Sequence, residues 1–180
     1  MERTPEETTS TPRRLSLRDY QRELAERLRQ ADSTRSASKL GVQVGAETWL
    51  IDLVEAGEVI PVPPITSVPL TRPWFRGVAN VRGNLYSVVD FAAFVGVGSV
   101  EVTERARLVL LGERLRSAAA LLVDRSLGLR NPDQLRARLL QGQAGWVRAQ
   151  YDDADGTAWK ELDARQLVQH EQFLNPGHTI

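Results

Sequence analysis

The stretch from residue 74 to residue 95 constrains the fold more than any other part of the chain. It holds two β-prone runs, residues 77–81 and 85–89. Three residues separate these runs: Arg82, Gly83 and Asn84. Because glycine and asparagine tolerate the positive φ angles of tight hairpin turns, the pattern predicts a β-hairpin.

A short helix is predicted directly after this hairpin. Asp90 is of a residue type that caps helices, because its carboxylate accepts hydrogen bonds from the free N–H groups of the first turn. Phe91, Phe94 and Val95 follow at helical spacing, and Gly96 is a typical helix stop. The whole stretch therefore predicts a strand, a turn, a second strand and a capped helical turn.

Arg82 is the residue of this hairpin that turn formation does not explain. Tight turns favour glycine, asparagine or aspartate, and arginine is none of these. One interpretation is a solvated surface charge. The other is a contact residue held out on a rigid hairpin. The residue pattern alone leaves both open.

Composition restricts the classes of function. The chain has 180 residues and a formal net charge of zero, so no global field attracts nucleic acid or an anionic membrane. The chain has no cysteine, which excludes disulfides, thiolate catalysis and cysteine-bound zinc. No apolar run approaches the length of a membrane helix. We therefore expect a cytoplasmic protein without direct membrane insertion, of one domain or two small ones.

Residues 1–37 are predicted to form a disordered tail followed by an amphipathic helix. Residues 1–14 are rich in threonine and charged residues and contain proline. From Ser16 to Ala31, apolar residues recur at helical spacing, and a polar linker follows. The sequence leaves open whether this helix docks on the body of the protein or on a partner.

Short strands are predicted throughout residues 38–170. They are residues 40–44, 48–54, 58–62, 77–81, 85–89, 107–111, 117–123, 146–151 and 157–162, with a weak continuation at 124–130. The strand at 58–62 is predicted to lie at a sheet edge, because Pro61 cannot donate a hydrogen bond.

Two helical segments are predicted in the second half. Asn131 and Pro132 open the first, which contains apolar leucines and ends at Gly142. Asp163 caps the second. Residues 171–180 are predicted to form a C-terminal tail.

The two halves of this region resemble each other. Strand, glycine turn, strand, hairpin and capped helix occur over residues 40–95, and again over residues 107–168 with one helix inserted. Five short strands per half predict a mainly β fold of two small barrels, because closure removes exposed sheet edges. The expected subdomains are residues 38–98 and 99–170, which can be intertwined.

No residue pattern indicates catalysis, a metal or a cofactor. The two histidines, His170 and His178, have no metal-ligand spacing and cannot complete a credible Ser-His-Asp set. The acidic run at residues 152–156 fits a hairpin tip better than a calcium loop. A non-enzymatic binding module follows by elimination. A β-barrel nucleic-acid binder and a structural interaction module are the alternatives.

At this point the hairpin carries a recognisable motif. Residues 77–83 read G-V-A-N-V-R-G and residues 88–91 read V-V-D-F. This pattern resembles the CheW family, the coupling proteins of bacterial chemosensory arrays, with a hairpin motif G-V-x-N-x-R-G. The flanking residues 74–76 and 84–87 look most like the PilI branch, which serves chemosensory systems that control type IV pili. The resemblance covers residues 38–170.

The resemblance implies a fold, an activity and partners. The family fold consists of two five-stranded SH3-like barrels with short helices, to which this chain adds an N-terminal helix. The activity is non-enzymatic: the protein couples the cytoplasmic tip of a methyl-accepting chemoreceptor to the regulatory domain of a CheA-type histidine kinase. It implies a cytoplasmic location at membrane-associated arrays, no cofactor and no nucleic acid.

The resemblance also assigns partner-binding residues. They are Arg82, Asn80, Gly83, Glu58, Val59 and Ile60. Two departures from the family pattern affect the expected contacts. Pro61 stands where the family commonly has a basic residue, and residues 145–149 replace a G-V-A pattern and precede a longer turn.

Overall fold

A computed structural model of the chain describes residues 38–139, 142 and 144–177. The predicted tail and amphipathic helix of residues 1–37 lie outside these described residues, and so do residues 178–180. Within the described residues, no helix is long and apolar enough to cross a membrane.

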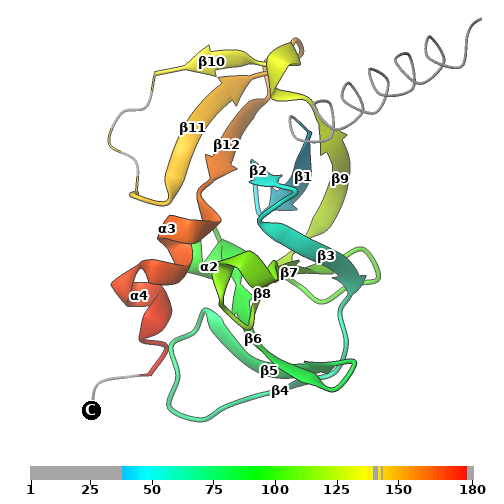
Figure 1. Cartoon of the computed structure of the whole chain (residues 1–180), viewed down its shortest axis with the longest axis vertical. Coiled ribbons are helices and arrows are strands. Elements are labelled where there is room, and N and C mark those ends of the chain that lie inside the picture. Colours follow the sequence, from blue (N-terminus) through cyan, green and yellow to red (C-terminus); the bar gives the residue numbers. More distant parts are fainter. Residues whose placement is uncertain (1–37, 140–141, 143, 178–180) are drawn as a thin grey trace, which may run out of the picture. The chain divides into compact units, whose positions relative to one another are not determined.

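The first of two sheets combines the start and the end of the described chain (Figure 1). Its strands lie in the order β10-β11-β12-β2-β1-β9. Their bounds are β1 (Lys39–Val44), β2 (Glu47–Asp52), β9 (Arg125–Arg130), β10 (Arg136–Arg138), β11 (Val147–Asp152) and β12 (Ala158–Leu162). All neighbours are antiparallel except β12 and β2, which run parallel.

The second sheet is formed entirely by the middle of the chain. Its order is β3-β7-β8-β6-β5-β4, with β6 and β8 as the parallel pair. The bounds are β3 (Ala56–Pro61), β4 (Ile65–Thr66), β5 (Phe75–Val81), β6 (Asn84–Asp90), β7 (Arg107–Leu111) and β8 (Ala119–Val123). As expected from Pro61, β3 lies at an edge, where it pairs with β7 alone.

The two sheets have the same architecture, and they exchange strands. In each half of the chain, six strands are followed by a capped helix: α2 (Phe91–Val95) after β6, and α3 (Ala164–Gln169) after β12. The first two strands of each half join the sheet built by the last four strands of the other half. The subdomain boundary expected near residue 98 therefore lies between the two repeats. It does not divide the two sheets, because the second sheet contains strands from both sides of residue 98.

The mainly β class is confirmed, whereas the number of strands differs from the prediction. Each sheet has six strands rather than five, and its order runs from one edge strand to another instead of closing. The two-residue strand β4 and the three-residue strand β10 are the additional members. Both are too short to show a period-two pattern in the sequence.

Helix α2 lies between the sheets and completes a shared core (Figure 1). Phe91 is fully buried, and its ring meets the Trp49 ring of the other sheet edge-on, with 5.0 Å between ring centroids. One turn further along α2, the Phe94 ring contacts the Trp74 ring, with 5.1 Å between ring centroids. This short helix therefore fixes the two sheets to each other through aromatic packing.

Asp90 does more than cap α2. Its carboxylate is fully buried and accepts hydrogen bonds from the backbone N–H of Ala93, the Ser99 hydroxyl and the backbone N–H of Val100. The Arg76 guanidinium lies 3.5 Å away. One side chain thus joins β6, α2, the segment after α2 and β5.

Two local predictions differ from the structure. The helix expected from Asn131 onwards is wrong: Asn131 does cap a turn, but this is the 3₁₀ turn η2 (Pro132–Gln134), and strand β10 follows it. The predicted tail instead contains α4 (Glu171–Leu174), in which Phe173 is buried. In both places, pairing or packing with a distant segment decides the local structure.

Candidate partner-binding site

The β5–β6 hairpin turns over two residues, not over the three that separate the predicted strands. Val81 pairs with Asn84, which leaves Arg82 and Gly83 as the turn. Both have positive φ angles, 53° for Arg82 and 89° for Gly83. Such a turn matches the twist of the flanking strands and normally takes glycine or asparagine at both positions. Arg82 therefore adopts a backbone conformation that is costly for its residue type.

The neighbouring motif residues stabilise this turn. The Asn80 side-chain oxygen accepts a hydrogen bond of 2.8 Å from the backbone N–H of Gly83. At the other end of β5, Gly77 has a φ of 124°, and a Cβ atom there would lie only 2.0 Å from the carbonyl oxygen of Thr66. Asparagine and glycine are thus required at these positions by the shape of the hairpin.

Arg82 and Glu58 form a two-pronged ion pair. The two terminal nitrogens of Arg82 donate hydrogen bonds to the two carboxylate oxygens of Glu58 at 2.8 and 2.6 Å. The hydrogen bond and the charge of Glu58 raise the pKa of Arg82 above its ordinary value. Glu58 lies on β3 and Arg82 lies in the β5–β6 turn, although β7, β8 and β6 separate β3 from β5 in the strand order. The two side chains can therefore meet only because this sheet is strongly curved.

The ion pair is accessible from solvent. The Arg82 side chain is 73% exposed and the Glu58 side chain is 40% exposed. Exposed ion pairs contribute little to folding stability, because water and salt screen them. Together with the unusual backbone angle of Arg82, this exposure indicates that the pair is not explained by stability alone.

The other residues predicted on β3 differ in how far they are exposed to solvent. Val59 and Ile60 are only partly exposed, because they pack against the hydrophobic core. Pro61 is exposed at the end of β3 and pairs with Arg107. Glu58 is therefore the residue of this stretch whose charge is presented at the surface beside the hairpin.

Leu85 belongs to this surface, although the sequence analysis did not select it. It follows the turn on β6, opposite Asn80, and is 63% exposed. From the sequence, a leucine in an apolar strand is expected to lie in the core. The register of the hairpin shows instead that Leu85 points outward. We define the coupling corner as Glu58, Asn80, Arg82, Gly83 and Leu85. It combines a charged pair, an exposed apolar side chain and a rigid turn.

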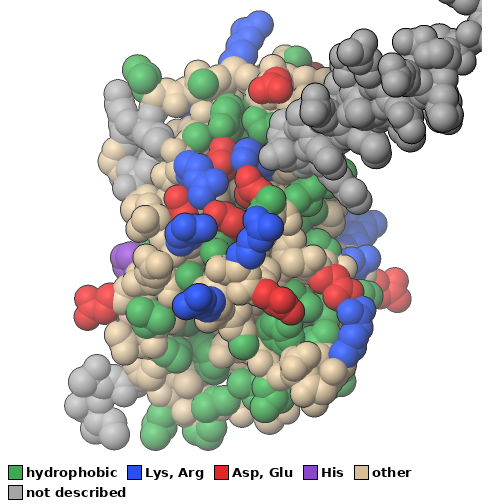
Figure 2. All heavy atoms as spheres, viewed as in Figure 1, with side chains coloured by type: hydrophobic (Ala, Val, Ile, Leu, Met, Phe, Trp, Pro, Cys, Tyr) green, Lys and Arg blue, Asp and Glu red, His purple; other side chains and the backbone are tan. Residues whose placement is uncertain are grey.

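A second group of charges lies on the first sheet and its connections. The Arg148 guanidinium lies within 3.4 Å of three carboxylates, those of Glu55, Glu161 and Asp163. Figure 2 shows side chains of both signs gathered on this face of the molecule. Burial opposes the charge of Arg148, but its interactions with Glu55 and Asp163 outweigh burial and raise its pKa.

Tyr151 is connected to this group of charges through Glu161, and its pKa leads to a prediction about pH. Its hydroxyl donates a 2.8 Å hydrogen bond to Glu161, which is buried and also pairs with Lys39 at 3.0 Å. Burial, followed by this hydrogen bond and the charge of Glu161, raises the pKa of Tyr151 from 10.0 to about 12.

We expect the stabilisation from Tyr151 to be complete below pH 10 and to be lost as the pH rises towards about 12. The sign follows because the raised pKa favours the neutral phenol in the folded state. The ultraviolet absorbance of tyrosinate, compared between the natural protein and Tyr151→Phe, isolates this titration. A midpoint for Tyr151 at or below pH 10 would contradict the assignment.

Within the described residues, no three histidine, aspartate or glutamate side chains are grouped so that they could hold a metal ion. Most of the charged groups that the structure describes are instead paired with one another or exposed. The arrangement favours recognition of another macromolecule through surface contacts.

Comparisons with known proteins agree with this architecture. The CheW-like domain matches residues 39–172. A solved structure of the scaffolding protein TtCheW from Thermoanaerobacter tengcongensis superimposes with a TM-score of 0.64, covering 76% of this chain and 90% of that protein. Its sequence identity is 18%, so this likeness concerns the fold.

Sequence relatives lie in the same family. Protein PilI of Pseudomonas aeruginosa is 34% identical over 151 residues, which cover 81% of this chain and 83% of PilI. The chemotaxis protein CheW of Thermotoga maritima is 27% identical over 99 residues, 55% of this chain and 64% of that protein. The domain match and the extended similarity to PilI together show that the chain belongs to the CheW-like family.

Proposed function

We propose that this protein is a non-enzymatic adaptor that couples a chemoreceptor to a CheA-type histidine kinase in a chemosensory system controlling type IV pili. One partner is the cytoplasmic tip of the receptor, and the other is the regulatory domain of the kinase. The proposed location is the cytoplasm, at membrane-associated arrays. The similarity to PilI over most of both chains supports the link to the pilus system.

The observation that carries this proposal is the coupling corner. Arg82, the motif arginine, is held in a costly turn conformation and is presented with Glu58 at the surface. A guanidinium held in a fixed orientation can bind a carboxylate or carbonyl of a partner with little further loss of side-chain entropy. The strand-exchanged sheets supply the rigid frame that keeps this corner at a fixed distance from other surfaces.

Coupling requires more than tethering. An adaptor changes kinase activity only if its contacts differ in free energy between the active and inactive arrangements of its partners. Glu58 and Arg82 provide a means for such a difference, because a partner carboxylate can compete with Glu58 for the guanidinium. We propose that receptor or kinase contacts at this corner exchange with the internal ion pair.

Reconstitution tests the function directly. The protein is mixed with a CheA-type kinase and a receptor cytoplasmic fragment from the same organism, and kinase autophosphorylation is measured. We expect receptor-dependent activation only when the protein is present. Failure of the protein to bind either partner, or specific salt-dependent binding of single-stranded RNA or DNA instead, would contradict the proposal.

A further inference from the structure

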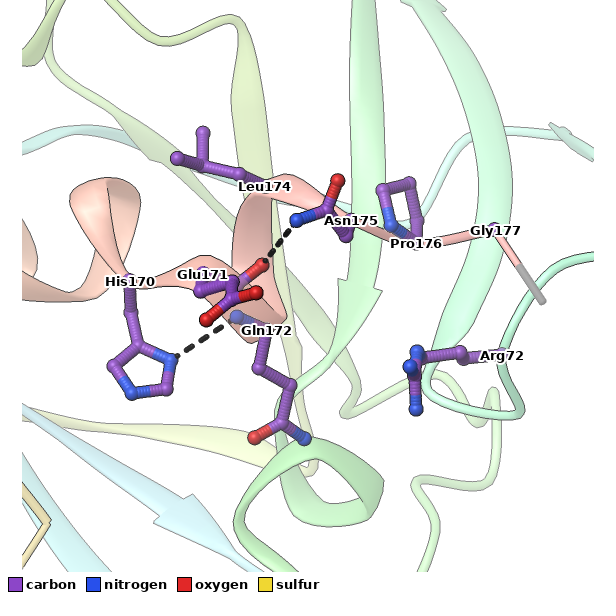
Figure 3. A pocket seen from close by; sticks show the side chains of 8 residues that line it. All are labelled: Arg72, His170, Glu171, Gln172, Leu174, Asn175, Pro176 and Gly177. Atoms are coloured by element: carbon purple, nitrogen blue, oxygen red, sulfur yellow. Dashed lines mark hydrogen bonds between the residues drawn. The ribbon is translucent and has the colours of Figure 1, made fainter. Parts of the chain in front are cut away.

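A polar pocket lies apart from the coupling corner, between the loop before β5 and the C-terminal segment of the described chain. It has a volume of about 650 Å³. Arg72 forms one wall, and α4 with the residues that follow it forms the other (Figure 3). The Arg72 side chain extends towards the α4 wall, where Glu171 and Gln172 line the pocket.

Both walls are fixed in place. The backbone N–H of Arg72 donates a 2.7 Å hydrogen bond to the carbonyl of Pro176, and Thr71 pairs with Gly177. Phe173 anchors α4, because its buried ring stacks on the Trp74 ring with an interplanar angle of 10°. The pocket is therefore largely preformed, which lowers the entropic cost of binding.

Arg72 differs from comparable arginines because its side chain has no partner among the described residues. In the part of the chain that the structure describes, three arginines are half-buried: Arg72, Arg76 and Arg107. Arg76 interacts with Ser99 and Asp90, and Arg107 donates to two backbone carbonyls. The Arg72 Nε–H is shielded from solvent and has no acceptor. A buried charged donor without an acceptor is costly and indicates a missing partner.

Exposed leucines flank the unpaired arginine. Leu70 precedes it by two residues and is 73% exposed, and Leu174 lines the pocket and is 61% exposed. Leu70 has a φ of 59°, in a turn whose Thr71 hydroxyl donates to the Val68 carbonyl. A leucine held outward in the left-handed region is strained, as residues at binding sites often are. An arginine with exposed apolar side chains nearby is typical of protein interfaces.

We propose that this pocket binds an aspartate or glutamate side chain of a partner protein, with apolar residues on either side of that acid. The carboxylate pairs with the guanidinium of Arg72, whose Nε–H has no acceptor among the described residues, and the flanking apolar residues cover Leu70 and Leu174. The charge of Arg72 favours an acid, because its guanidinium has no acidic partner among the described residues, whereas Glu171 on the other wall opposes an acid. The inference does not depend on which partners contact the coupling corner.

Isotope-labelled full-length protein tests the proposal by NMR. The probe is the tripeptide Leu-Glu-Leu with both ends blocked, and the control is blocked Leu-Gln-Leu, which has nearly the same shape without the charge. We expect saturable shifts of the Arg72 Nε–H signal and of the Gln172 and Gly177 backbone signals with the glutamate peptide. For so few contacts, the dissociation constant should be on the order of millimolar.

Matched variants assign the effect to the pocket. Arg72→Gln should abolish the saturable shifts at Gln172 and Gly177, and Arg72→Lys should weaken them, because lysine lacks the planar fork. Arg136→Gln, which removes the same charge from the exposed strand β10, should change nothing. Glu171→Gln should strengthen binding several-fold, because it removes a like charge from the pocket wall.

Three results would overturn the proposal. They are equal binding of the two peptides, binding that survives in both Arg72 variants, and shifts produced by inorganic sulfate but not by the glutamate peptide. The last result would identify a general anion site rather than a site for an acidic protein segment. None of these results depends on kinase activation, so failure here is distinguishable from failure of the coupling function.

Discussion

Arg82→Gly is expected to abolish kinase coupling while leaving the protein folded. Glycine adopts the positive φ of this turn position without strain, so the hairpin should form at least as well as before. The substitution also removes the exposed pair with Glu58, whose loss has little effect on stability. If Arg82 is a central contact, affinity for the partner that it touches should fall by about 30-fold or more.

The measurements are receptor-dependent kinase activation and direct binding of each partner. Glu58→Gln is the matched control at the same corner, because it keeps the guanidinium but weakens the ion pair that orients it. We expect this variant to keep or raise affinity for the partner at this corner, because Glu58 competes less for the guanidinium, and to lose only part of the coupling. Full activation by a well-folded Arg82→Gly protein would contradict the role assigned to the corner.

Asp90→Ala is expected to be the most destabilising substitution at a single polar residue. It removes the cap of α2 and leaves the N–H groups of Ala93 and Val100 and the Ser99 hydroxyl without their acceptor. Loss of a cap costs about 1 kcal/mol, and breaking a buried charged network costs roughly 3–5 kcal/mol. Because small domains are stable by only about 5–15 kcal/mol, this loss removes a large fraction of the stability, and at the low end of that range it unfolds the protein.

Urea denaturation of Asp90→Ala, Asp90→Asn and Asp163→Ala checks this expectation. Asparagine keeps an acceptor oxygen, so the second variant should lose less stability than the first. Asp163 caps α3 with the same hydrogen-bond geometry but is only half-buried, and its removal should cost about 1–2 kcal/mol. Equal losses for Asp90→Ala and Asp163→Ala would show that burial of Asp90 contributes nothing.

Features set by neighbouring residues were predictable from the sequence. The caps at Asp90 and Asp163, the stop at Gly96 and the hairpin after Val81 all form as expected. In each case the decisive interactions lie within a few residues, so the residue types are sufficient evidence. The similarity of the two halves predicted two small five-stranded barrels; the two equivalent units are confirmed, but each is a six-stranded sheet that does not close.

Features set by distant contacts were not predictable. Residues 136–138 become a strand because they pair with β11, and this pairing outweighs the local helix signal that begins at Asn131. The C-terminal segment is ordered because Phe173 packs on Trp74, about a hundred positions earlier in the chain. No local pattern contains that information.

The candidate site likewise has features that the sequence predicts and features that depend on distant contacts. The family motif selected Arg82 and Glu58, but only the curvature of the second sheet shows that they form one ion pair. In the first sheet, the exchange of strand pairs between the two halves depends on pairing across more than 80 residues, as for β1 with β9. The exposure of Leu85 likewise follows from the register of β6 and not from its residue type.

The most direct test of the coupling corner is site-specific crosslinking in a reconstituted complex of adaptor, kinase and receptor fragment. The chain has no cysteine, so Leu85→Cys introduces a unique position for a photoreactive label. Leu129→Cys, on β9 of the other sheet and similarly exposed, is the control. We expect Leu85→Cys to crosslink to the kinase or the receptor and the control to do so weakly. An assembled, active complex in which Leu85→Cys gives no crosslink to either partner would contradict the account.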